Sequence, residues 1–499
     1  MRLHDLLVGL DVIDVSDPEV EVTSITNDSR RVAPGACYAC IPGAHVDGHG
    51  FAADAVRAGA SALLVERALD ASVVGDVAQV RVARVRGVLG AAAANLYDHP
   101  SRAMRTLGVT GTNGKTTTTF LLEAIARAAG DVPGVIGTTG ARVDGTSFAS
   151  DQVTSTTPEA CDLQRLLADM RAVGVGAVAM EVSSHGLDRR EVDGTEFAAV
   201  CFTNLSHEHL DYHGSLDAYF DAKARLFDGS FAPAAAINVD DVAGRSLLGR
   251  VARTDARVWT FGFADGTDDA IITARDVAID AQGTSFTLVD ASQRSSAAIR
   301  LALVGPFNVA NALAAAATAR AAGIGFDSVV AGLTAAHGVP GRVEPVDRGQ
   351  GFAVLVDYAH TPDALDGVLA AARALANGQR VLAVFGAGGD RDRAKRPLMG
   401  RAVAQGADVA ILTSDNPRTE PPETIADEVL AGLRDGNAEV LVELDRRVAI
   451  HTAIARATDG DVVVIAGKGH ETGQTIGART QPFDDRVVAA EALEALGWS

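Results

Sequence analysis

The sequence predicts an α/β protein with buried parallel sheets, divided into about three domains. Short, almost uniformly apolar runs alternate with helical patterns, as in AVAMEVSSHG, FAVLVDYAHTP and DVAILTSDNPR. Strands that are apolar throughout belong to sheets covered on both faces, in which helical crossovers join parallel strands. The length of 499 residues exceeds what one hydrophobic core supports. Each run ends in a polar or glycine-rich turn, at the strand end where such sheets bind ligands.

Two breaks in this pattern predict the domain boundaries. One lies near DHPSRAMRT, just before the first glycine-rich loop. The other lies near HGVPGRVEP, where two glycines and a proline stand close together. The resulting segments, 1–103, 104–339 and 340–499, each have an ordinary domain size.

The composition argues against several classes of protein. A formal net charge of -20 argues against nucleic acids and anionic membranes as partners. The start of the chain lacks the pattern of a signal peptide, and no uncharged apolar run reaches about 18 residues, so we expect a cytoplasmic protein without a membrane span. Cys37 and Cys40 form an isolated C-x-x-C without a second pair at zinc spacing, which predicts buried thiols.

The stretch VTGTNGKTTTTFLLEAIARAAG predicts a phosphate-binding loop between a strand and an amphipathic helix. Glycines let several backbone N–H groups point at one anion, and the helix N-terminus adds a favourable dipole. We expect Lys115 to neutralise the β- and γ-phosphates and the Thr116 hydroxyl to bind Mg²⁺. The general pattern has a glycine where this chain has Val109, so the loop is a shortened variant.

Two further strand ends carry candidate metal ligands. Glu181 lies in AMEVSSHGL and His209 in TNLSHEHLDYHG. A carboxylate and an imidazole near a phosphate loop can hold Mg²⁺ that phosphate oxygens also bind. The alternative is that these histidines cap a surface turn. Lys223, in YFDAKARLF, lies on a predicted helix, where a single lysine is ordinarily a solvated charge.

The stretch TSDNPRTE predicts a stiff turn after a buried strand, with Asp415 and Arg418 on its rim, because proline restricts its own backbone and that of Asn416. By itself it is also compatible with a surface turn that holds a salt bridge. Two other strand ends add charges, FGAGGDRDRAKRP with Arg391 and AGKGHET with Glu471. Arginines grip carboxylates and acids grip ammonium groups, so this set predicts a site for a zwitterion.

These motifs together resemble the Mur ligase family along essentially the whole chain. They occur in the family's order: TGTNGKTTT, MEVSSHGL, FTNLSHEHLDYHG, GPFNVANALAA, GRVE, VDYAHTPDAL, GGDRDRAKRPLMG, SDNPRTE and GKGHE. The resemblance implies an ATP-dependent amide ligase that joins meso-diaminopimelate to UDP-N-acetylmuramoyl-L-alanyl-D-glutamate through an acyl phosphate. It also implies three domains: a UDP-substrate domain (1–103), a central P-loop ATPase (104–339) and a Rossmann-like C-terminal domain that binds the amino acid (340–499). Alternatives are an L-lysine-adding member, a ligase like folylpolyglutamate synthase, and a P-loop ATPase without ligase chemistry.

The resemblance implies roles for individual residues around ATP. The ATP-binding set is Gly111, Thr112, Asn113, Gly114, Lys115, Thr116, Thr117, Thr118, Asn308, Arg342, Asp357 and His360. The catalytic set is Lys115, Lys223 and His209, and the Mg²⁺ ligands are Thr116, Glu181, His209 and Lys223. Lys223 matches a lysine that carries a carbamate, which makes chemical sense because a carbamate is an anion that can bind Mg²⁺, whereas an ammonium repels it.

The same resemblance implies the sites for the other substrates. The UDP-substrate set is Asn27, Ser29, Ala44, His45, Val46, Ser155, Thr156, Thr157, Ser183, Arg189 and Glu191. The amino-acid set is Arg391, Asp415, Asn416, Pro417, Arg418, Gly467 and Glu471. At 188–191 the spacing departs from the family pattern, so either Arg189 or Arg190 supplies the expected cation. The expected partners are ATP, the UDP-muramoyl-dipeptide and meso-diaminopimelate, and we expect a monomer.

Overall fold

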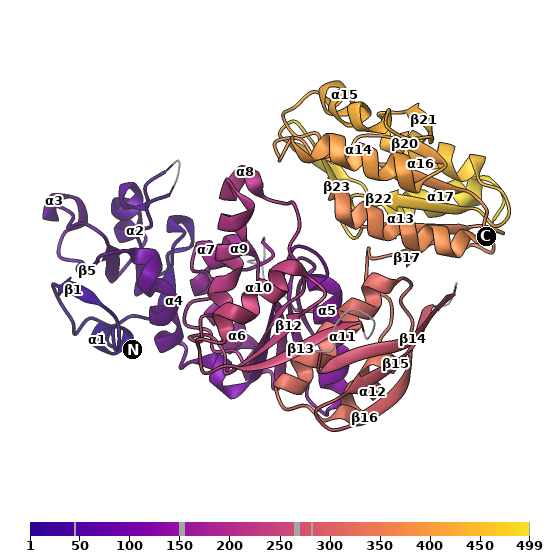
Figure 1. The fold of residues 1–499 in the computed structure, drawn as a ribbon. Helices are drawn as coiled ribbons and strands as arrows, with labels where there is room; N and C mark the ends of the chain where they lie inside the picture. The colour runs from indigo at the N-terminus through magenta and orange to yellow at the C-terminus, as the bar shows by residue number, and fades with distance from the viewer. Residues whose placement is uncertain (44–45, 149–154, 264–269, 281–282, 499) are drawn as a thin grey trace.

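The computed structural model describes residues 1–43, 46–148, 155–263, 270–280 and 283–498. It consists of three α/β parts that follow one another along the chain (Figure 1). The N-terminal part, indigo in the figure, and the C-terminal part, orange to yellow, lie on either side of the central part. Three such parts agree with the α/β class that the sequence predicted.

The N-terminal part is a sheet of strand order β1-β5-β4-β3-β2. Strand β1 pairs antiparallel with β5, and the other neighbours pair in parallel. Its elements are α1 (Leu3–Leu6), β1 (Val12–Val15), β2 (Ser24–Thr26), η1 (Ser29–Arg31), β3 (Ala36–Ala39), η2 (Gly48–Phe51), α2 (Ala52–Arg57), β4 (Ala62–Val65), α3 (Ala71–Val74), β5 (Ala78–Val82), α4 (Val85–Leu96) and η3 (Pro100–Ala103). Cys37 and Cys40 are buried free thiols on and just after β3, as predicted.

The central part is a larger sheet of strand order β16-β15-β14-β13-β12-β11-β6-β10-β7-β8-β9. Pairing is parallel from β7 through β10, β6, β11, β12 and β13 to β14. Its strands are β6 (Arg105–Thr110), β7 (Pro133–Gly137), β8 (Gly140–Val143), β9 (Thr146–Ser147), β10 (Ala177–Glu181), β11 (Ala199–Phe202), β12 (Ala234–Asn238), β13 (Arg257–Phe263), β14 (Ile272–Asp280), β15 (Gly283–Asp290) and β16 (Ser295–Leu301). Its helices are α5 (Lys115–Ala128), α6 (Ala160–Ala172), α7 (Ser184–Asp188), α8 (Leu210–His213), α9 (Leu216–Ala224), η4 (Arg225–Phe227), α10 (Val242–Val251), α11 (Pro306–Ala321) and α12 (Phe326–Ala335).

Antiparallel strands extend this sheet at both edges, which the prediction of parallel strands did not foresee. Strands β14, β15 and β16 form a meander, and β7, β8 and β9 form another. Only a few residues separate these strands along the chain, and such short connections suit antiparallel neighbours. Burial alternates along β15 and most of β16, as in a sheet with one solvated face, so these segments lack the uniformly apolar signal of the central strands.

The C-terminal part is a sheet of strand order β17-β18-β22-β19-β20-β21. Strand β17 pairs antiparallel with β18, and the remaining neighbours pair in parallel. A separate antiparallel hairpin, β23–β24, follows β22. Its elements are β17 (Glu344–Pro345), β18 (Ala353–Asp357), α13 (Pro362–Ala376), β19 (Val381–Phe385), α14 (Lys395–Gly406), β20 (Val409–Leu412), α15 (Pro422–Leu433), β21 (Glu439–Val442), α16 (Arg446–Arg456), β22 (Val462–Ala466), β23 (Gly473–Ile476), β24 (Arg479–Pro482) and α17 (Asp485–Ala495).

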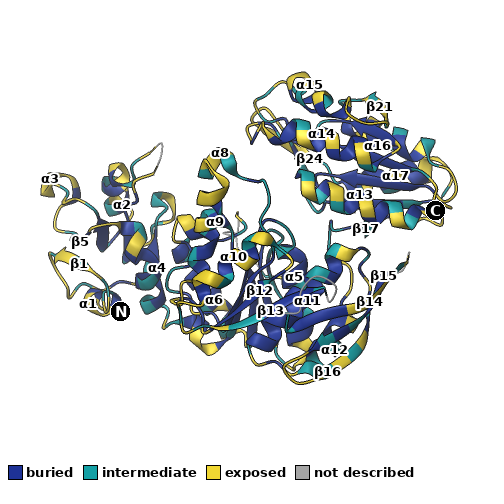
Figure 2. Cartoon of the chain, viewed as in Figure 1, coloured by how far each residue is buried: buried dark blue, intermediate teal, exposed yellow. Residues whose placement is uncertain are grey.

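Hydrophobic clusters cover both faces of the two larger sheets. In the central part, one cluster includes side chains of α5, α11 and α12, and another lies on the opposite face with side chains of α6 and α10. The C-terminal sheet is likewise covered by α13, α14 and α15 on one face and by α16 and α17 on the other. Figure 2 shows these strands as buried and the outer helix faces as exposed. Within the described residues, no helix is long and apolar enough to cross a membrane.

Candidate active site

The predicted phosphate loop lies between β6 and α5. Gly111 and Gly114 have φ values of 152° and 87°, a region that favours glycine, and a Cβ at Gly111 would collide with Thr203 Oγ1. Lys115 begins α5, and its Nζ donates to the carbonyl oxygens of Gly111 and Thr112, each at 2.9 Å. Burial lowers the pKa of Lys115, and Glu181 opposes that shift. The lysine therefore stands over the loop, where a bound phosphate would favour its charged form.

A cavity of about 400 Å³ adjoins this loop. From the predicted ATP set it is lined by Asn113, Gly114, Thr117, Arg342, Asp357 and His360. Asn308 does not line it: Asn308 is buried behind Asn311, whose Nδ2 donates to Asn308 Oδ1 at 3.2 Å. Arg342 Nη2 donates to Thr116 Oγ1 at 3.0 Å and so ties the start of the C-terminal part to α5.

His360 has a defined tautomer in this cavity. Its Nδ1 lies 2.8 Å from the carbonyl oxygen of Tyr358, and because a carbonyl can only accept, Nδ1 carries the proton. Burial, followed by Lys395, lowers the pKa of His360 to about 3. Nε2 is therefore left as an unprotonated acceptor. Asp357 lies nearby and accepts from the backbone N–H groups of Val343 and Ala359, while burial raises its pKa.

A second cavity, of about 170 Å³, brings the predicted metal ligands Thr116, Glu181, His209 and Lys223 together. The two carboxylate oxygens of Glu181 accept from the N–H and hydroxyl of Thr138 at 2.9 and 3.1 Å. His209 lies seven residues beyond the last residue of β11 and caps α8, so the prediction that it stands at the strand end was wrong. The intervening segment folds back over the phosphate loop, since Asn204 O accepts from Thr112 N at 2.9 Å.

Lys223 is not the solvated charge that its place on a helix suggests. Its side chain is buried, with the residue 1% exposed, and Nζ donates to Gly111 O at 2.8 Å. Within the described residues it forms no ion pair, and its Nζ lies 4.5 Å from the centre of the Tyr219 ring. Burial, followed by the charge of Lys115, lowers the pKa of Lys223 well below its usual value. A neutral amine of this kind is the form that reacts with CO₂.

These donors fit a magnesium ion that is shared with phosphate. Within the described part of the chain, no group of three or more His, Cys, Asp or Glu side chains is arranged to enclose a metal. Mg²⁺ commonly takes one or two protein carboxylates and completes its shell with substrate phosphates and water. A hydroxyl, one carboxylate and an imidazole beside a phosphate loop match that preference.

A third cavity, of about 550 Å³, lies between the central and C-terminal parts. On its central side it is lined by Thr138, Ser155, Thr156, Ser183 and Arg189. On its C-terminal side it is lined by Gly388, Arg391, Lys395, Asp415, Asn416, Arg418, Gly467 and Glu471. The C-terminal residues follow β19, β20 and β22, which are neighbours in the sheet. The structure thus brings residues of the predicted UDP-substrate set and of the predicted amino-acid set together around one cavity.

Two guanidinium groups in this cavity, those of Arg391 and Arg418, have no acidic partner among the residues that the structure describes. Arg418 donates from Nη1 to Gly389 O at 2.7 Å, and Arg391 donates to its neighbour's carbonyl, Asp390 O, at 3.1 Å. Within the described residues neither forms an ion pair. Burial, followed by the charge of Arg391, lowers the pKa of Arg418. By contrast, Arg393, Lys395 and Arg396 from the same basic stretch already pair with glutamates.

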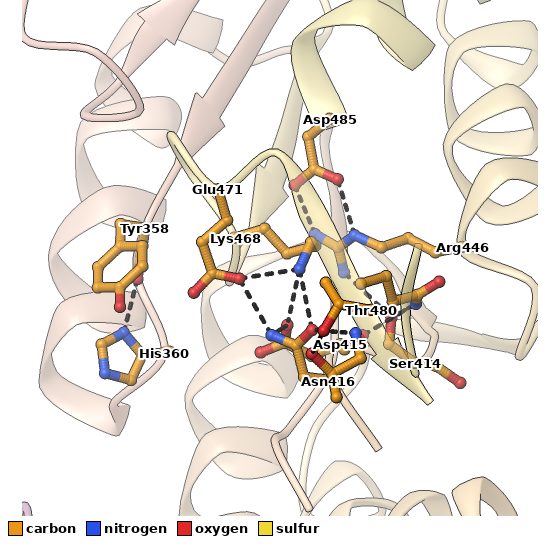
Figure 3. A network of polar contacts seen from close by, with 12 residues as sticks. Tyr358, His360, Ser414, Asp415, Asn416, Arg446, Lys468, Glu471, Thr480 and Asp485 are labelled. Atoms are coloured by element: carbon orange, nitrogen blue, oxygen red, sulfur yellow. Dashed lines mark hydrogen bonds and ion pairs between the residues drawn. The ribbon is translucent and has the colours of Figure 1, made fainter. Parts of the chain in front are cut away.

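Acidic groups also follow these strands: Asp415 comes after β20 and Glu471 after β22 (Figure 3). The Nζ of Lys468 donates to Glu471 Oε2 at 2.9 Å and to Asn416 Oδ1 at 3.2 Å, and lies 3.8 Å from Asp415 Oδ1. Asn416 Nδ2 also donates to Glu471 at 3.0 Å. Asp415 is buried rather than on the rim of its turn, and burial raises its pKa. Behind this group the fully buried pair Arg446–Asp485 joins α16 to α17.

Some predicted residues lie outside these cavities. Thr157 uses its hydroxyl to bind Glu181 O and Ser183 Oγ, and Pro417 lies behind the cavity rather than on its wall.

Of the two arginines that could supply the expected cation, Arg189 lines the large cavity, whereas Arg190 pairs with Asp193. Glu191 is buried, and burial followed by Glu159 raises its pKa to about 8.

The N-terminal residues of the UDP set lie apart from the three cavities. Asn27 Oδ1 accepts from Cys161 Sγ at 3.3 Å, Ser29 begins η1, and Val46 is 57% exposed. Ala44 and His45 fall outside the described residues.

Tyr358 and Glu208 are among the residues of the large cavity that the sequence did not identify as site residues. Tyr358 lines all three cavities, and Glu208 lines two of them. Both lie within stretches that the sequence singled out, VDYAHTP and SHEHLD. Each also contacts a distant part of the chain, because Tyr358 packs against His470 and Glu208 pairs with Lys395.

Models of three protein families match this chain. The Mur ligase family, catalytic domain, matches residues 21–97; the Mur ligase middle domain matches 109–319; and the Mur ligase, glutamate ligase domain, matches 341–469. Among curated relatives, the UDP-N-acetylmuramoyl-L-alanyl-D-glutamate--2,6-diaminopimelate ligase of Solibacter usitatus is 42% identical, over 100% of this chain and 99% of its own. The enzyme of the same name from Gloeobacter violaceus is 44% identical, over 99% and 98%.

Solved structures show the same fold. A UDP-N-acetylmuramoyl-L-alanyl-D-glutamate--2,6-diaminopimelate ligase matches all of both chains with a TM-score of 0.71 and 33% identity. MurF from Acinetobacter baumannii matches 93% of this chain and 95% of its own at 20% identity, TM-score 0.67. Folylpolyglutamate synthase from Mycobacterium tuberculosis matches 82% and 95% at 21% identity, TM-score 0.63, and these last two likenesses concern the fold alone. With family models along most of its length and full-length relatives above 40% identity, this chain belongs to the Mur ligase family.

Proposed function

We propose that this chain is an ATP-dependent amide ligase that adds meso-diaminopimelate to UDP-N-acetylmuramoyl-L-alanyl-D-glutamate during peptidoglycan precursor synthesis. The observation that carries the proposal is the large cavity between the central and C-terminal parts. It shares residues with the metal cavity on one side, and on the other it is lined by Arg391 and Arg418, which form no ion pair within the described part of the chain. A carboxyl activated near the phosphate loop and an incoming amino acid can therefore meet in one cavity.

The proposed reaction has two steps. The D-glutamyl carboxylate attacks the γ-phosphorus of ATP, and the bond from that phosphorus to the β,γ-bridging oxygen breaks. The products of this step are ADP and an acyl phosphate. The neutral amine of diaminopimelate then attacks the acyl carbon, phosphate departs with the C–O electron pair, and the nitrogen loses a proton. Lys115 and the N–H groups of the loop offset charge on the transferring phosphoryl group, so the protein acts mainly by positioning and electrostatics.

Thr116, Glu181 and His209 would hold Mg²⁺, which neutralises phosphate charge when it is bound. Lys223, which is buried and has no acidic partner among the described residues, would carry the carbamate that adds a further anionic ligand. The predicted set from the N-terminal part, Asn27 and Ser29 with 44–46, would hold the uridine nucleotide. Ser155, Thr156, Ser183 and Arg189 would hold the muramoyl-dipeptide. We further propose domain limits of 1–103, 104–339 and 340–499, a monomeric state and a cytoplasmic location.

Specificity for diaminopimelate follows from charge. Arg391 and Arg418 would bind the carboxylate at the far end of the amino acid, and Asp415 and Glu471 would bind the ammonium beside it. L-lysine lacks that carboxylate and would leave both guanidiniums without a partner, which costs about 1–3 kcal/mol or more. This favours diaminopimelate over the lysine-adding alternative. The likeness to folylpolyglutamate synthase concerns the fold alone, so it does not favour that activity.

The test is a phosphate-release assay with purified protein, ATP and the UDP-muramoyl-dipeptide, run with meso-diaminopimelate, with L-lysine and without an amine. We expect phosphate release that requires both co-substrates and proceeds well only with diaminopimelate. Equal release with and without the co-substrates would indicate an ATPase without ligase chemistry. Equal rates with lysine would contradict the proposed specificity.

A further inference from the structure

The hairpin β23–β24 packs against the turn that carries Asp415 and Arg418. It forms its own small sheet after β22 and pairs through Ile476 with Arg418. Two backbone hydrogen bonds make this pairing: Arg418 N donates to Thr475 O at 3.1 Å, and Gly477 N donates to Arg418 O at 2.6 Å. Arg418 has a φ of 51°, which is uncommon for a residue with a Cβ, so the hairpin holds the arginine in a conformation that the turn alone does not favour.

Gln474 connects the same hairpin to the preceding part of the turn. It is 5% exposed, and its Nε2 donates to Asp415 O at 2.9 Å. The next residue continues the contact, because Thr475 N donates to Asn416 Oδ1 at 2.9 Å. The hairpin therefore contacts the turn at Asp415, Asn416 and Arg418, the last two on either side of Pro417. The contact with the backbone of Asp415 is made by the Gln474 side chain.

We infer that Gln474 is a positioning residue which, through this hairpin, sets where the Arg418 guanidinium stands and so makes the site select an amino acid with a remote carboxylate. The inference rests on the proposed function. Gln474 does not line the cavity and binds backbone, so it acts through the turn rather than on the substrate. A bidentate contact between a guanidinium and a carboxylate depends on geometry, and a displacement of about 1 Å is enough to lose much of it.

The experiment compares Gln474→Ala, Gln474→Met and Gln481→Ala with the wild type. Methionine keeps the length and apolar volume of the side chain but lacks the donor. Gln481 is the exposed cross-strand neighbour of Gln474, and its Nε2 donates to Gln474 Oε1 at 3.4 Å. Its truncation removes this contact but keeps the bond from Gln474 to Asp415 O, so it is the matched control. For each protein kcat and KM are measured with meso-diaminopimelate and with high L-lysine, KM is measured for ATP, and thermal unfolding is followed.

We expect KM for diaminopimelate to rise about 5- to 10-fold in both Gln474 variants, as loss of one buried hydrogen bond implies. We expect kcat, KM for ATP and kcat/KM for lysine to stay near wild type, so that selectivity falls by the same factor, and Gln481→Ala to resemble wild type. Unchanged selectivity, or a parallel loss with both amines together with a lower unfolding midpoint, would overturn the inference. A wild type inactive with diaminopimelate would instead overturn the proposed function, so the two failures are distinguishable.

Discussion

The Nζ of Lys395, on α14, lies 3.1 Å from Oε1 of Glu208 in the central part, and both side chains are buried. A second contact lies alongside it, between His207 Nε2 and Asp392 Oδ2 at 3.0 Å. Both contacts join segments more than 180 positions apart in the sequence, on the two sides of the cavity where the substrates are proposed to meet. The arrangement of the central and C-terminal parts is therefore held by polar contacts next to the reaction space.

The first prediction concerns the Glu208–Lys395 pair. Removing one partner leaves the other charge buried without compensation, so Glu208→Gln and Lys395→Met should each lower kcat about tenfold or more by weakening the contact between the central and C-terminal parts. The double variant should lose less than the sum of the two, with a coupling of about 0.5–3 kcal/mol in a double-mutant cycle. Strictly additive losses in kcat would show that the two residues act independently.

The second prediction concerns the stability of the C-terminal part. Arg446 and Asp485 form a bidentate pair with no exposed surface, so Arg446→Met should lower the free energy of unfolding by roughly 3–5 kcal/mol. Its neighbour Arg447 pairs with Glu491 at the surface, and Arg447→Met should cost at most about 1 kcal/mol. Urea denaturation of both variants gives the comparison. Similar losses of unfolding free energy in Arg446→Met and Arg447→Met would contradict the larger role given to the buried pair.

The third prediction concerns pH. Burial, followed by Lys395, lowers the pKa of His360 from 6.5 to about 3. Between about pH 3 and pH 6.5 the unfolded chain binds a proton on His360 that the folded chain does not bind. The free energy of unfolding is therefore unaffected by His360 well above pH 6.5 and decreases as the pH falls below that value. By pH 5 the loss amounts to at most about 2 kcal/mol. Urea denaturation at pH 7 and pH 5 should show a smaller difference for His360→Asn than for wild type, and equal differences would refute the shift.

The fourth prediction concerns Lys223. If its buried amine carries a carbamate, ¹³C NMR of the protein in labelled bicarbonate should show a carbamate carbon that is absent from Lys223→Arg. Activity should fall in buffer depleted of CO₂ and return when bicarbonate is added, because an anionic ligand beside the phosphates is lost and regained. A spectrum without that resonance, at any bicarbonate concentration, would count against the modification.

Features that depend on local sequence were predictable. The apolar runs ending in FGAGGDRD, SDNPR and GKGHE predicted buried parallel strands, and these became the neighbouring strands β19, β20 and β22. The glycines and Lys115 predicted the phosphate loop, because the motif carries its own backbone geometry.

Features that depend on contacts between distant segments were not predictable. His209 appeared to end a strand, but the chain from Asn204 onward folds over the phosphate loop through bonds to residues about 90 positions away. Of the basic stretch after β19, only Arg391 remains unpaired within the described residues, because Glu208, Glu420 and Glu428 neutralise the others. Gln474 gave no signal at all, since a single glutamine in a polar stretch resembles any surface residue.

The most direct test of the central claim, selection of the amine by its remote carboxylate, is kcat/KM for meso-diaminopimelate and L-lysine in wild type and Arg418→Ala. The account predicts that the variant loses about 100-fold or more with diaminopimelate, while lysine turnover and ATP binding stay near wild type. Undiminished diaminopimelate turnover in the variant would contradict it.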